Sequence, residues 1–518
     1  MGGAIVAAVA GEIFAATVAG TVIAFAINMV ASTILSKVFA PDAPSQNNSN
    51  VQEPNPGNRQ QLAPAGDNKL PVIYGTAYTG GIMTDLSIST NNQDLYYVFS
   101  LCEVTNTESG GTPDAISFGD VYWGGKKCIF GANGEVTGLL DESLYDPGDA
   151  TAGVQDIAGY MDIYLYSNGS SSGWNTASSA IGIMSASNLL YKWDGNKLMS
   201  NTAFAIVHIK YSQSRNITGL QQTRFQVINA RSAPGDCFLD YLSSTRYGAA
   251  IPLAQIDTTS LTELNTYCSG DFDYTTYTGG SGTIPRFTFN GLLDTNRKIM
   301  PNIQSMSDCC DCLVKYNEIV GEWAVVIQSP DDVPVMALTD SNIISSITVS
   351  PIDLSNSFNV IEIKFPDGSE KDTFNSSTFD LATLAPELLF PNEPVNKQSV
   401  SLYLTNDNVT AQFLANRMLK AAREDLQLAF DINYVGLQLE AGDIVTVTNT
   451  NYGWDEKLFR IMKVTEKFND SGQVTAALNL SEYNPDVYAD VPITQFTPAP
   501  NTGIGTPTAF GTIPVPVV

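Results

Sequence analysis

Histidine, cysteine and charged side chains are all scarce in this sequence. Its 518 residues include one histidine, His208, and seven cysteines, and charged residues make up 15% of the chain. General acid–base catalysis and most catalytic zinc sites draw on histidine first, so histidine-based catalysis has a single candidate residue. An odd, sparse set of cysteines is unlike the dense, even frameworks of small secreted modules. We therefore interpret the cysteines as thiols made in a reducing cytoplasm.

Basic side chains are the scarcer charged class. The 26 Lys and Arg stand against 53 Asp and Glu, which gives a formal net charge of −27. Binding to nucleic acid comes largely from Lys and Arg that neutralise phosphates. The acidic excess therefore argues against stable, sequence-independent binding, and it predicts that DNA passes this protein without adhering to it.

The chain does have ample material for buried cores. Hydrophobic residues make up 43% and aromatic residues 10% of it, and the length fits three or four domains of roughly 150 residues each. Short runs rich in Val, Ile, Tyr, Phe and Thr, bounded by Gly, Asn and Asp, predict strands. These strands are expected at Leu95–Leu101, Phe204–Tyr211, Arg224–Val227 and Trp323–Ile327.

Three amphipathic helices interrupt this strand-rich sequence. Apolar residues at steps of three and four predict helices at Asp236–Thr245, 297–315 and Val409–Asp425. Helices among many short strands predict a β-dominated α+β fold rather than one all-β sandwich.

Changes in composition predict the domain organisation. Pro, Asn, Gln and Ser mark a linker, and a Pro-rich stretch marks an extended tail. The expected parts are an apolar N-terminal helix (1–40), the linker (41–68), a first β-barrel-like domain with a loop-rich insertion (69–235), an α+β domain (236–350), a second α+β or barrel-like domain (351–490) and the tail (491–518).

The N-terminal segment 13–36 carries no charged side chain. At about 1.5 Å per residue, a helix of this length is long enough to cross a hydrocarbon layer roughly 30 Å thick. A cleavable secretory signal normally begins with Lys or Arg, yet the only ionisable side chain before this segment is that of Glu12. Small residues at four-residue spacing, such as Ala15 and Ala19, would also let copies of the helix pack closely. A bilayer anchor and a helix bundled with its own copies both stay open.

Three motifs that could carry chemistry are interpreted as structural. Gly80 and Gly81 interrupt a strand but no GK[ST] follows, which indicates a bend rather than a phosphate loop. Gly248 is the expected stop of the helix before it. Cys309 and Cys312 have CxxC spacing, but a structural zinc needs four ligands and no second pair lies near, so with Cys310 they are interpreted as small buried residues. We predict no catalytic, cofactor-binding or metal-binding residue.

The succession of these segments resembles that of one family. In chain order they are an apolar N-terminal helix, PVIYGTA with its Gly pair, the helix ending in RYG, FNGLLDTNRKIMPNIQSMSDCCDCLVKYNEIVGEWAVVI, LANRMLKAARED, LEAGDIVTVT and LSEYNPDVY. No single motif is specific, but their colinear order is. On this order the chain resembles, over residues 69–490, the J-like tip attachment proteins, which are the tail-tip hubs of long-tailed bacteriophages.

This resemblance implies a homotrimer whose barrel-like tube domains, with inserted α+β domains, form a ring under the tail tube. It implies a structural, non-enzymatic protein of the virion tail tip, assembled in the host bacterial cytoplasm. The expected partners are the distal tail protein or tail-tube ring, the tape-measure protein and receptor-binding fibre proteins. DNA would pass through the lumen without stable binding, and acidic walls would prevent adhesion.

The chain departs from the family pattern in two ways, and two alternative functions stay open. Larger family members continue into fibronectin-like modules and a fibre, whereas this chain stops shortly after Glu482–Pro485, so we expect another protein to recognise the receptor. The N-terminal helix would plug the lumen or contact the host membrane through residues 13–36. The alternatives are a membrane-anchored surface adhesin and a tail-associated cell-wall hydrolase that uses paired carboxylates.

Overall fold

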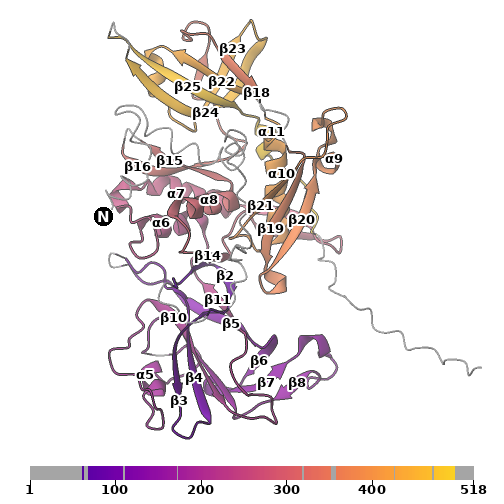
Figure 1. Ribbon diagram of the computed structural model, residues 1–518. Coiled ribbons are helices and arrows are strands. Elements are labelled where there is room, and N and C mark those ends of the chain that lie inside the picture. The colour runs from indigo at the N-terminus through magenta and orange to yellow at the C-terminus, as the bar shows by residue number, and fades with distance from the viewer. Residues whose placement is uncertain are drawn as a thin grey trace, which may run out of the picture.

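The computed structural model describes residues 61–62, 68–108, 111–171, 173–317, 320–351, 358–424, 426–468 and 472–495. These residues form four units (Figure 1). We call them the first β unit (68–231), the helical unit (232–327), the side unit (358–424) and the last β unit (336–351 with 426–482). The first β unit lies at the bottom of Figure 1, the last β unit at the top, and the side unit stands beside the helical unit.

Two six-stranded sheets build the first β unit. The strands of one sheet are β14 (Gly291–Leu293), β1 (Val72–Tyr74), β4 (Asp94–Glu103), β10 (Thr202–Lys210) and β9 (Met161–Tyr166), with β3 (Ile82–Ile88) also paired to β4. The strands of the other are β2 (Thr76–Thr79), β11 (Thr223–Asn229), β5 (Ile116–Trp123), β6 (Lys126–Phe130), β7 (Val136–Leu140) and β8 (Val154–Asp156). Both sheets contribute to one buried core, in which the rings of Phe99 and Phe225 lie 6.1 Å apart.

Two glycines let the chain change sheets within a few residues. The chain leaves β1 for β2 at Gly75 (φ 61°) and returns to the first sheet through Gly81 (φ 73°). Only glycine adopts such angles without strain. A Cβ on Gly75 would also lie 2.1 Å from the carbonyl oxygen of Phe289. The predicted bend at Gly80–Gly81 is therefore confirmed.

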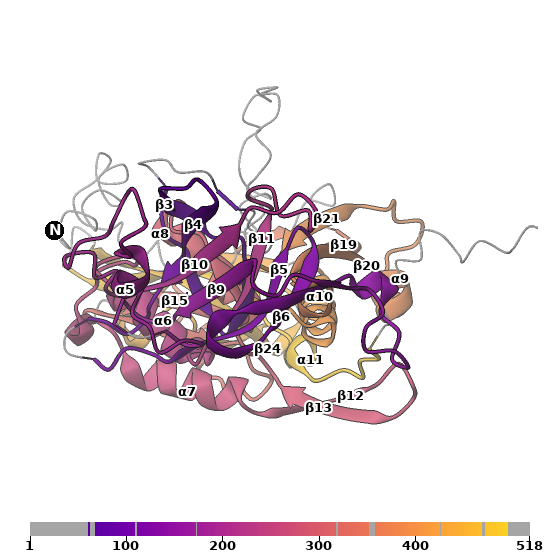
Figure 2. The ribbon, with the colours of Figure 1, turned by 90° about the horizontal axis from the view of Figure 1, so that it is seen from below.

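The helical unit combines three helices with two hairpins. Its elements are α6 (Pro234–Ser243), α7 (Thr258–Cys268), β12 (Asp271–Thr275), β13 (Ser281–Pro285), α8 (Ile299–Cys310), β15 (Cys312–Asn317) and β16 (Glu322–Ile327). Pro234 opens α6, where its missing N–H costs nothing. The β12–β13 hairpin lies at the rim of the molecule when it is seen from below (Figure 2).

The side unit packs one long helix on a three-stranded sheet. Its elements are β19 (Val360–Asp367), β20 (Thr373–Asp380), α9 (Leu381–Leu384), β21 (Lys397–Ser401) and α10 (Asn408–Ala421). The Asp407 carboxylate accepts the N–H groups of Val409 and Thr410 and so caps α10. The ring of Phe413 in α10 lies 4.7 Å from that of Phe272 in β12. The side and helical units therefore share one apolar core.

The last β unit is a six-stranded sheet. In order across the sheet its strands are β17 (Met336–Leu338), β23 (Ile444–Asn449), β24 (Trp454–Phe468), β25 (Val474–Glu482), β22 (Leu426–Ile432) and β18 (Thr348–Pro351). The strands thus come from both sides of residue 351, where the sequence analysis placed a domain boundary. The division into domains itself stays a prediction.

The predicted strands and the helix predicted at Asp236–Thr245 match the elements described above, and the helix predicted at Val409–Asp425 ends earlier, at Ala421. The third, expected at 297–315, ends earlier, at Cys310, because Asp311 takes a left-handed conformation (φ 52°) and Cys312 begins a strand. The expected β-dominated α+β fold is confirmed. Among the residues described here, no helix is both long and apolar enough to span a membrane. The predicted helix at 13–36, most of the linker and the tail beyond residue 495 lie outside the described residues.

Candidate functional site

The single histidine is built into a sheet. His208 on β10 has its Nδ1 2.8 Å from Asp162 Oδ2 on β9 and its Nε2 3.2 Å from Asp94 Oδ1 on β4. Its ring stacks on that of Tyr96, with the centroids 4.3 Å apart. Carboxylates engage both ring nitrogens, so His208 ties β10 to both of its neighbours.

All seven cysteines are free and buried. Cys310 ends α8 and Cys312 begins β15, and their Sγ atoms lie 3.5 Å apart. Burial raises the pKa of the Cys309 thiol to about 12. The interpretation of Cys309, Cys310 and Cys312 as small buried residues is confirmed, but Cys312 lies on a strand rather than on the predicted helix. Within the described part of the chain, no three or more His, Cys, Asp and Glu side chains are grouped so that they could hold a metal ion.

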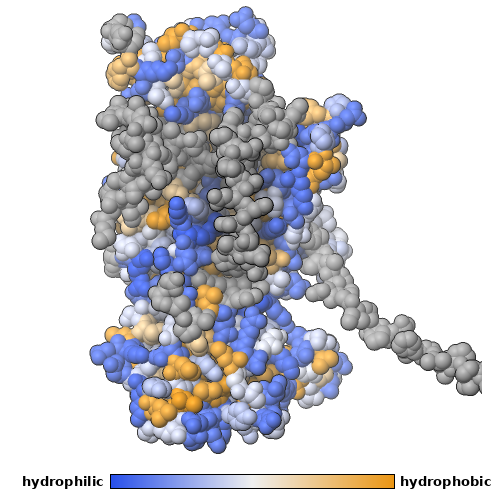
Figure 3. Space-filling model, in the orientation of Figure 1, coloured by the Kyte–Doolittle hydropathy of each residue, from blue (hydrophilic) through white to orange (hydrophobic). Residues whose placement is uncertain are grey.

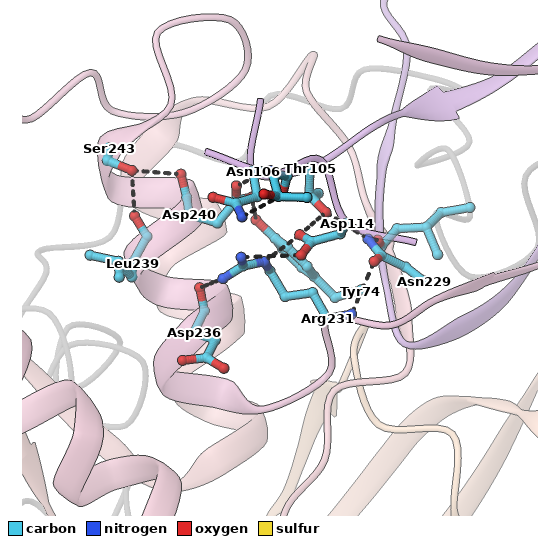
Figure 4. A network of polar contacts seen from close by, with 12 residues as sticks. Tyr74, Thr105, Asn106, Asp114, Asn229, Arg231, Asp236, Leu239, Asp240 and Ser243 are labelled. Carbon is cyan, nitrogen blue, oxygen red and sulfur yellow. Dashed lines mark hydrogen bonds and ion pairs between the residues drawn. The ribbon is translucent and has the colours of Figure 1, made fainter. Parts of the chain in front are cut away.

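A buried polar network joins the first β unit to α6 (Figure 4). We call it the barrel–helix junction and define it by Tyr74, Asn106, Asp114, Arg231 and Asp240. Asp240 on α6 is 7% exposed. Its carboxylate accepts the Tyr74 hydroxyl at 2.8 Å and the Asn106 N–H at 2.9 Å. Burial raises the pKa of Asp240, and these donors and the charge of Arg231 oppose the rise.

Arg231 makes a second set of hydrogen bonds in the barrel–helix junction. It donates to Asp114 through Nε (2.6 Å) and Nη2 (3.3 Å), and to the carbonyl oxygen of Asp236 through Nη1 (2.9 Å). The Thr105 hydroxyl donates to the same Asp114 carboxylate at 2.6 Å. Charged hydrogen bonds of this kind have a specific geometry, so they fix the position of α6 on the first β unit.

Residues 483–495, which we call the C-terminal strap, connect the last β unit to the helical and side units. It leaves β25, forms α11 (Pro485–Tyr488) and then pairs with β12, where Thr275 donates its N–H to the Ile493 carbonyl oxygen at 2.9 Å. Arg417 of α10 bonds both the Tyr488 carbonyl oxygen and, at 2.5 Å, the carboxylate of Asp311. The Arg417 side chain is 3% exposed. Its charge is thus neutralised by Asp311, the residue that directly follows α8.

The outer surface of the first β unit also carries apolar side chains. Figure 3 shows hydrophobic residues among hydrophilic ones on the visible face of this unit. Leu86 on β3 is 45% exposed and Tyr191 69% exposed. They belong to adjacent segments, because the Ser87 hydroxyl donates to the Tyr191 carbonyl oxygen at 2.6 Å.

Comparison with known proteins gives this geometry a context. No protein-family model matches the chain. The baseplate hub protein pb3 of Escherichia phage T5 is 24% identical to it over 323 residues, which cover 57% of this chain and 33% of that protein. The chain is a homologue of this phage baseplate hub protein. It spans about a third of the length of its hub relative.

One solved structure shares the fold of this chain over almost the whole length of both. A chain in the virion of a native gene transfer agent particle matches with a TM-score of 0.53 and 13% identity, covering 95% of this chain and 99% of that one. This match shows a common fold. The resemblance to tail-tip hubs that the sequence analysis stated is confirmed by the hub relative.

Sequence reasoning missed the residues that join the units of this chain. It singled out RYG after α6, but α6 ends at Ser243 and Gly248 does not stop it. Gly248 is needed because a Cβ there would lie 1.9 Å from the Tyr241 carbonyl oxygen. Tyr247 donates its hydroxyl to Asp240 at 2.9 Å. The prediction of no catalytic, cofactor or metal residue stays a prediction.

Proposed function

We propose that this chain is a structural tail-tip hub protein of a bacteriophage virion. Copies of it, three by our proposal, form a ring that closes the distal end of the tail tube and gates the channel for DNA ejection. The observation that carries this proposal is the similarity over 323 residues to a baseplate hub protein. The fold shared with a gene transfer agent virion chain over 95% of this chain agrees with it.

The proposed partners are other tail components. The ring would bind the tail-tube ring or distal tail protein above, contact the tape-measure protein, and hold receptor-binding fibre proteins below. The net charge of −27 supports passage of DNA without adhesion, because acidic walls do not bind phosphate. Exposed apolar residues such as Leu86 and Tyr191 are candidates for contacts between proteins.

A structural rather than enzymatic role forms part of the proposal. The side chains that most often carry catalysis are committed to the fold, since His208 bonds two carboxylates and every cysteine is buried. A zymogram of the purified protein on bacterial cell wall tests this part. We expect no clearing, and clearing would restore the hydrolase alternative.

Two measurements on the full chain test the assembly. Light scattering of the purified protein should give about three times the chain mass of 55.6 kDa. Antibodies against the first β unit should label the tail tip of intact particles in electron micrographs. A lipid-bound monomer found in host membranes and absent from particles would refute the proposal and favour the adhesin.

A further inference from the structure

A hairpin tip of the side unit reaches across to the first β unit. Between β19 and β20 the chain turns through η6 (Gly368–Glu370), and we call residues 368–372 the tip. The Tyr78 N–H on β2 donates to the Asp372 carboxylate at 2.6 Å. The Lys371 amine lies 2.5 Å from Glu142 Oε2 and 4.5 Å from the centre of the Tyr122 ring. Tyr78 and Asp372 are thus hydrogen-bonded although they lie 294 positions apart in the sequence.

The conformation of the tip is one that its residues rarely adopt. Lys371 (φ 58°) and Asp372 (φ 57°) are both left-handed, although neither is glycine. Left-handed non-glycine residues are strained and persist only where surrounding contacts hold them. Some of the holding contacts lie within the side unit, where the Asp372 N–H donates to the Asp367 carbonyl oxygen at 2.8 Å. Others come from the first β unit, since Arg224 on β11 donates to the Lys371 carbonyl oxygen at 3.2 Å. Undocking removes this second set of contacts.

The Asp372 carboxyl is the buried centre of this contact. Asp372 is 2% exposed, and burial raises its pKa from 3.8 to about 7. The Tyr78 N–H and the charge of Arg224 oppose the rise, and the charge of Asp367 adds to it. Burial disfavours the charged form of Arg224 as well, and for this basic group it lowers the pKa.

Other titratable groups face the tip from each element packed around it. They are Asp367, Glu370 and Lys371 of the hairpin itself, Tyr78 of β2, Arg224 of β11, Asp120 and Tyr122 of β5, Glu142 of η4 (Glu142–Leu144) and Asp407 before α10. Burial raises the pKa of Tyr78 to about 12 and that of Tyr122 further, so neither phenol changes charge below neutral pH.

We propose that the tip is a proton-controlled latch, which holds the side unit to the first β unit in acid and loosens as the pH rises to neutrality. The docked carboxyl binds its proton more tightly than a free aspartate does. Docking is therefore strongest below pH 3.8 and is weakened progressively until the pH reaches about 7. Above that, docked and free forms are both ionised and the dependence ends.

Hydrogen exchange of the Tyr78 amide in the full-length protein tests the latch. Protection is measured by mass spectrometry at pH 5.5 and 7.5 and corrected for the intrinsic rate of exchange. We expect the protection factor of Tyr78 to fall roughly 20-fold over this interval. The variant D372N keeps an oxygen that accepts this N–H but cannot ionise. Its protection should be the same at both pH values and exceed that of the native protein at pH 7.5.

Two controls separate the latch from general effects of pH. Asp443 in the last β unit is another acid whose pKa burial raises, so D443N should retain the native fall at Tyr78. K371M loses the ion pair with Glu142 and should reduce protection at both pH values while retaining the fall between them. Constant protection in the native protein, an equal fall in D372N, or loss of the fall in K371M would each overturn the proposal. None of these results depends on the proposed tail-tip function.

Discussion

Replacing Arg231 by Met tests whether paired charge holds the barrel–helix junction. Arg231 makes two bonds to Asp114 and one to the Asp236 carbonyl oxygen. The side chains of Arg231 and Asp114 are only 13% and 17% exposed, so water solvates neither charge well. Methionine keeps an unbranched apolar stem but offers no donor. The variant R231M therefore leaves the Asp114 carboxylate buried and without its counter-charge.

The expected loss follows from these contacts. Removing one partner of a buried ion pair costs roughly 3–5 kcal/mol, because the other charge stays buried. The Thr105 hydroxyl donates to Asp114 in both proteins, so this bond does not change the difference, but it keeps the stranded carboxylate partly satisfied and favours the lower end of that range. We expect R231M to lower the free energy of unfolding of the first β unit by about 3 kcal/mol. The double variant R231M/D114N removes the stranded charge and should recover at least about 1 kcal/mol of this.

Urea unfolding followed by tryptophan fluorescence measures the loss. Trp123, Trp174 and Trp193 lie in the first β unit. Replacing Trp323 and Trp454 by Phe in every protein compared confines the signal to this unit. K127M is the matched control, because the Lys127–Asp120 pair is 34% and 39% exposed and should contribute less than about 0.5 kcal/mol. A loss in R231M no larger than that in K127M, or a double variant no more stable than R231M, would refute the reasoning.

Two further predictions concern the backbone and the thiols. G75A should destabilise the protein by more than about 3 kcal/mol, since its Cβ would meet the Phe289 carbonyl oxygen, whereas G159A, which also has a positive φ but open space around it, should cost about 1 kcal/mol. Thermal unfolding of both variants measures the contrast, and equal losses would contradict it. Ellman's reagent should react negligibly with the folded protein and reveal seven thiols in denaturant, because all seven cysteines are free and buried; fewer thiols in denaturant would indicate a disulfide.

Local patterns predicted three of the longer helices and some of the strands. Periodicity and caps act over a few residues, so α6 and α10 follow from the spacing of their apolar side chains. The predicted end of α8 was wrong because Leu313 continues the helical spacing although Asp311 turns the chain. Helix α7 was missed, since it buries few residues and begins in a run of Thr and Ser. The signal that could have revealed the start of α7 is Asp257, whose carboxylate accepts the N–H groups of Thr259 and Ser260 and so caps the helix.

The contacts between units could not be predicted in this way. Tyr74 and Asp240 are 166 positions apart, and Arg231 and Asp114 are 117 apart. Each is an ordinary residue in its own segment, and only the path of the chain brings it to its partner. In a sequence with 53 acidic side chains, charge alone does not single out the few that are buried and paired.

The chemistry of the contacts predicts the order in which the units separate. The helical and side units share an apolar core around Phe272, Phe287 and Phe413, and opening it would expose hydrophobic area at about 25 cal/mol per Å². The first β unit adds only Val72 and Tyr74 of β1 to that core. It is otherwise held by the pairing of β1 with β14, by Leu292 of β14, which lies in the core of the first β unit, and by the barrel–helix junction and the latch. The polar groups of these contacts can bond water once they are open, so each bond lost costs only about 1 kcal/mol. We therefore expect the first β unit to part from the helical and side units before those two part from each other.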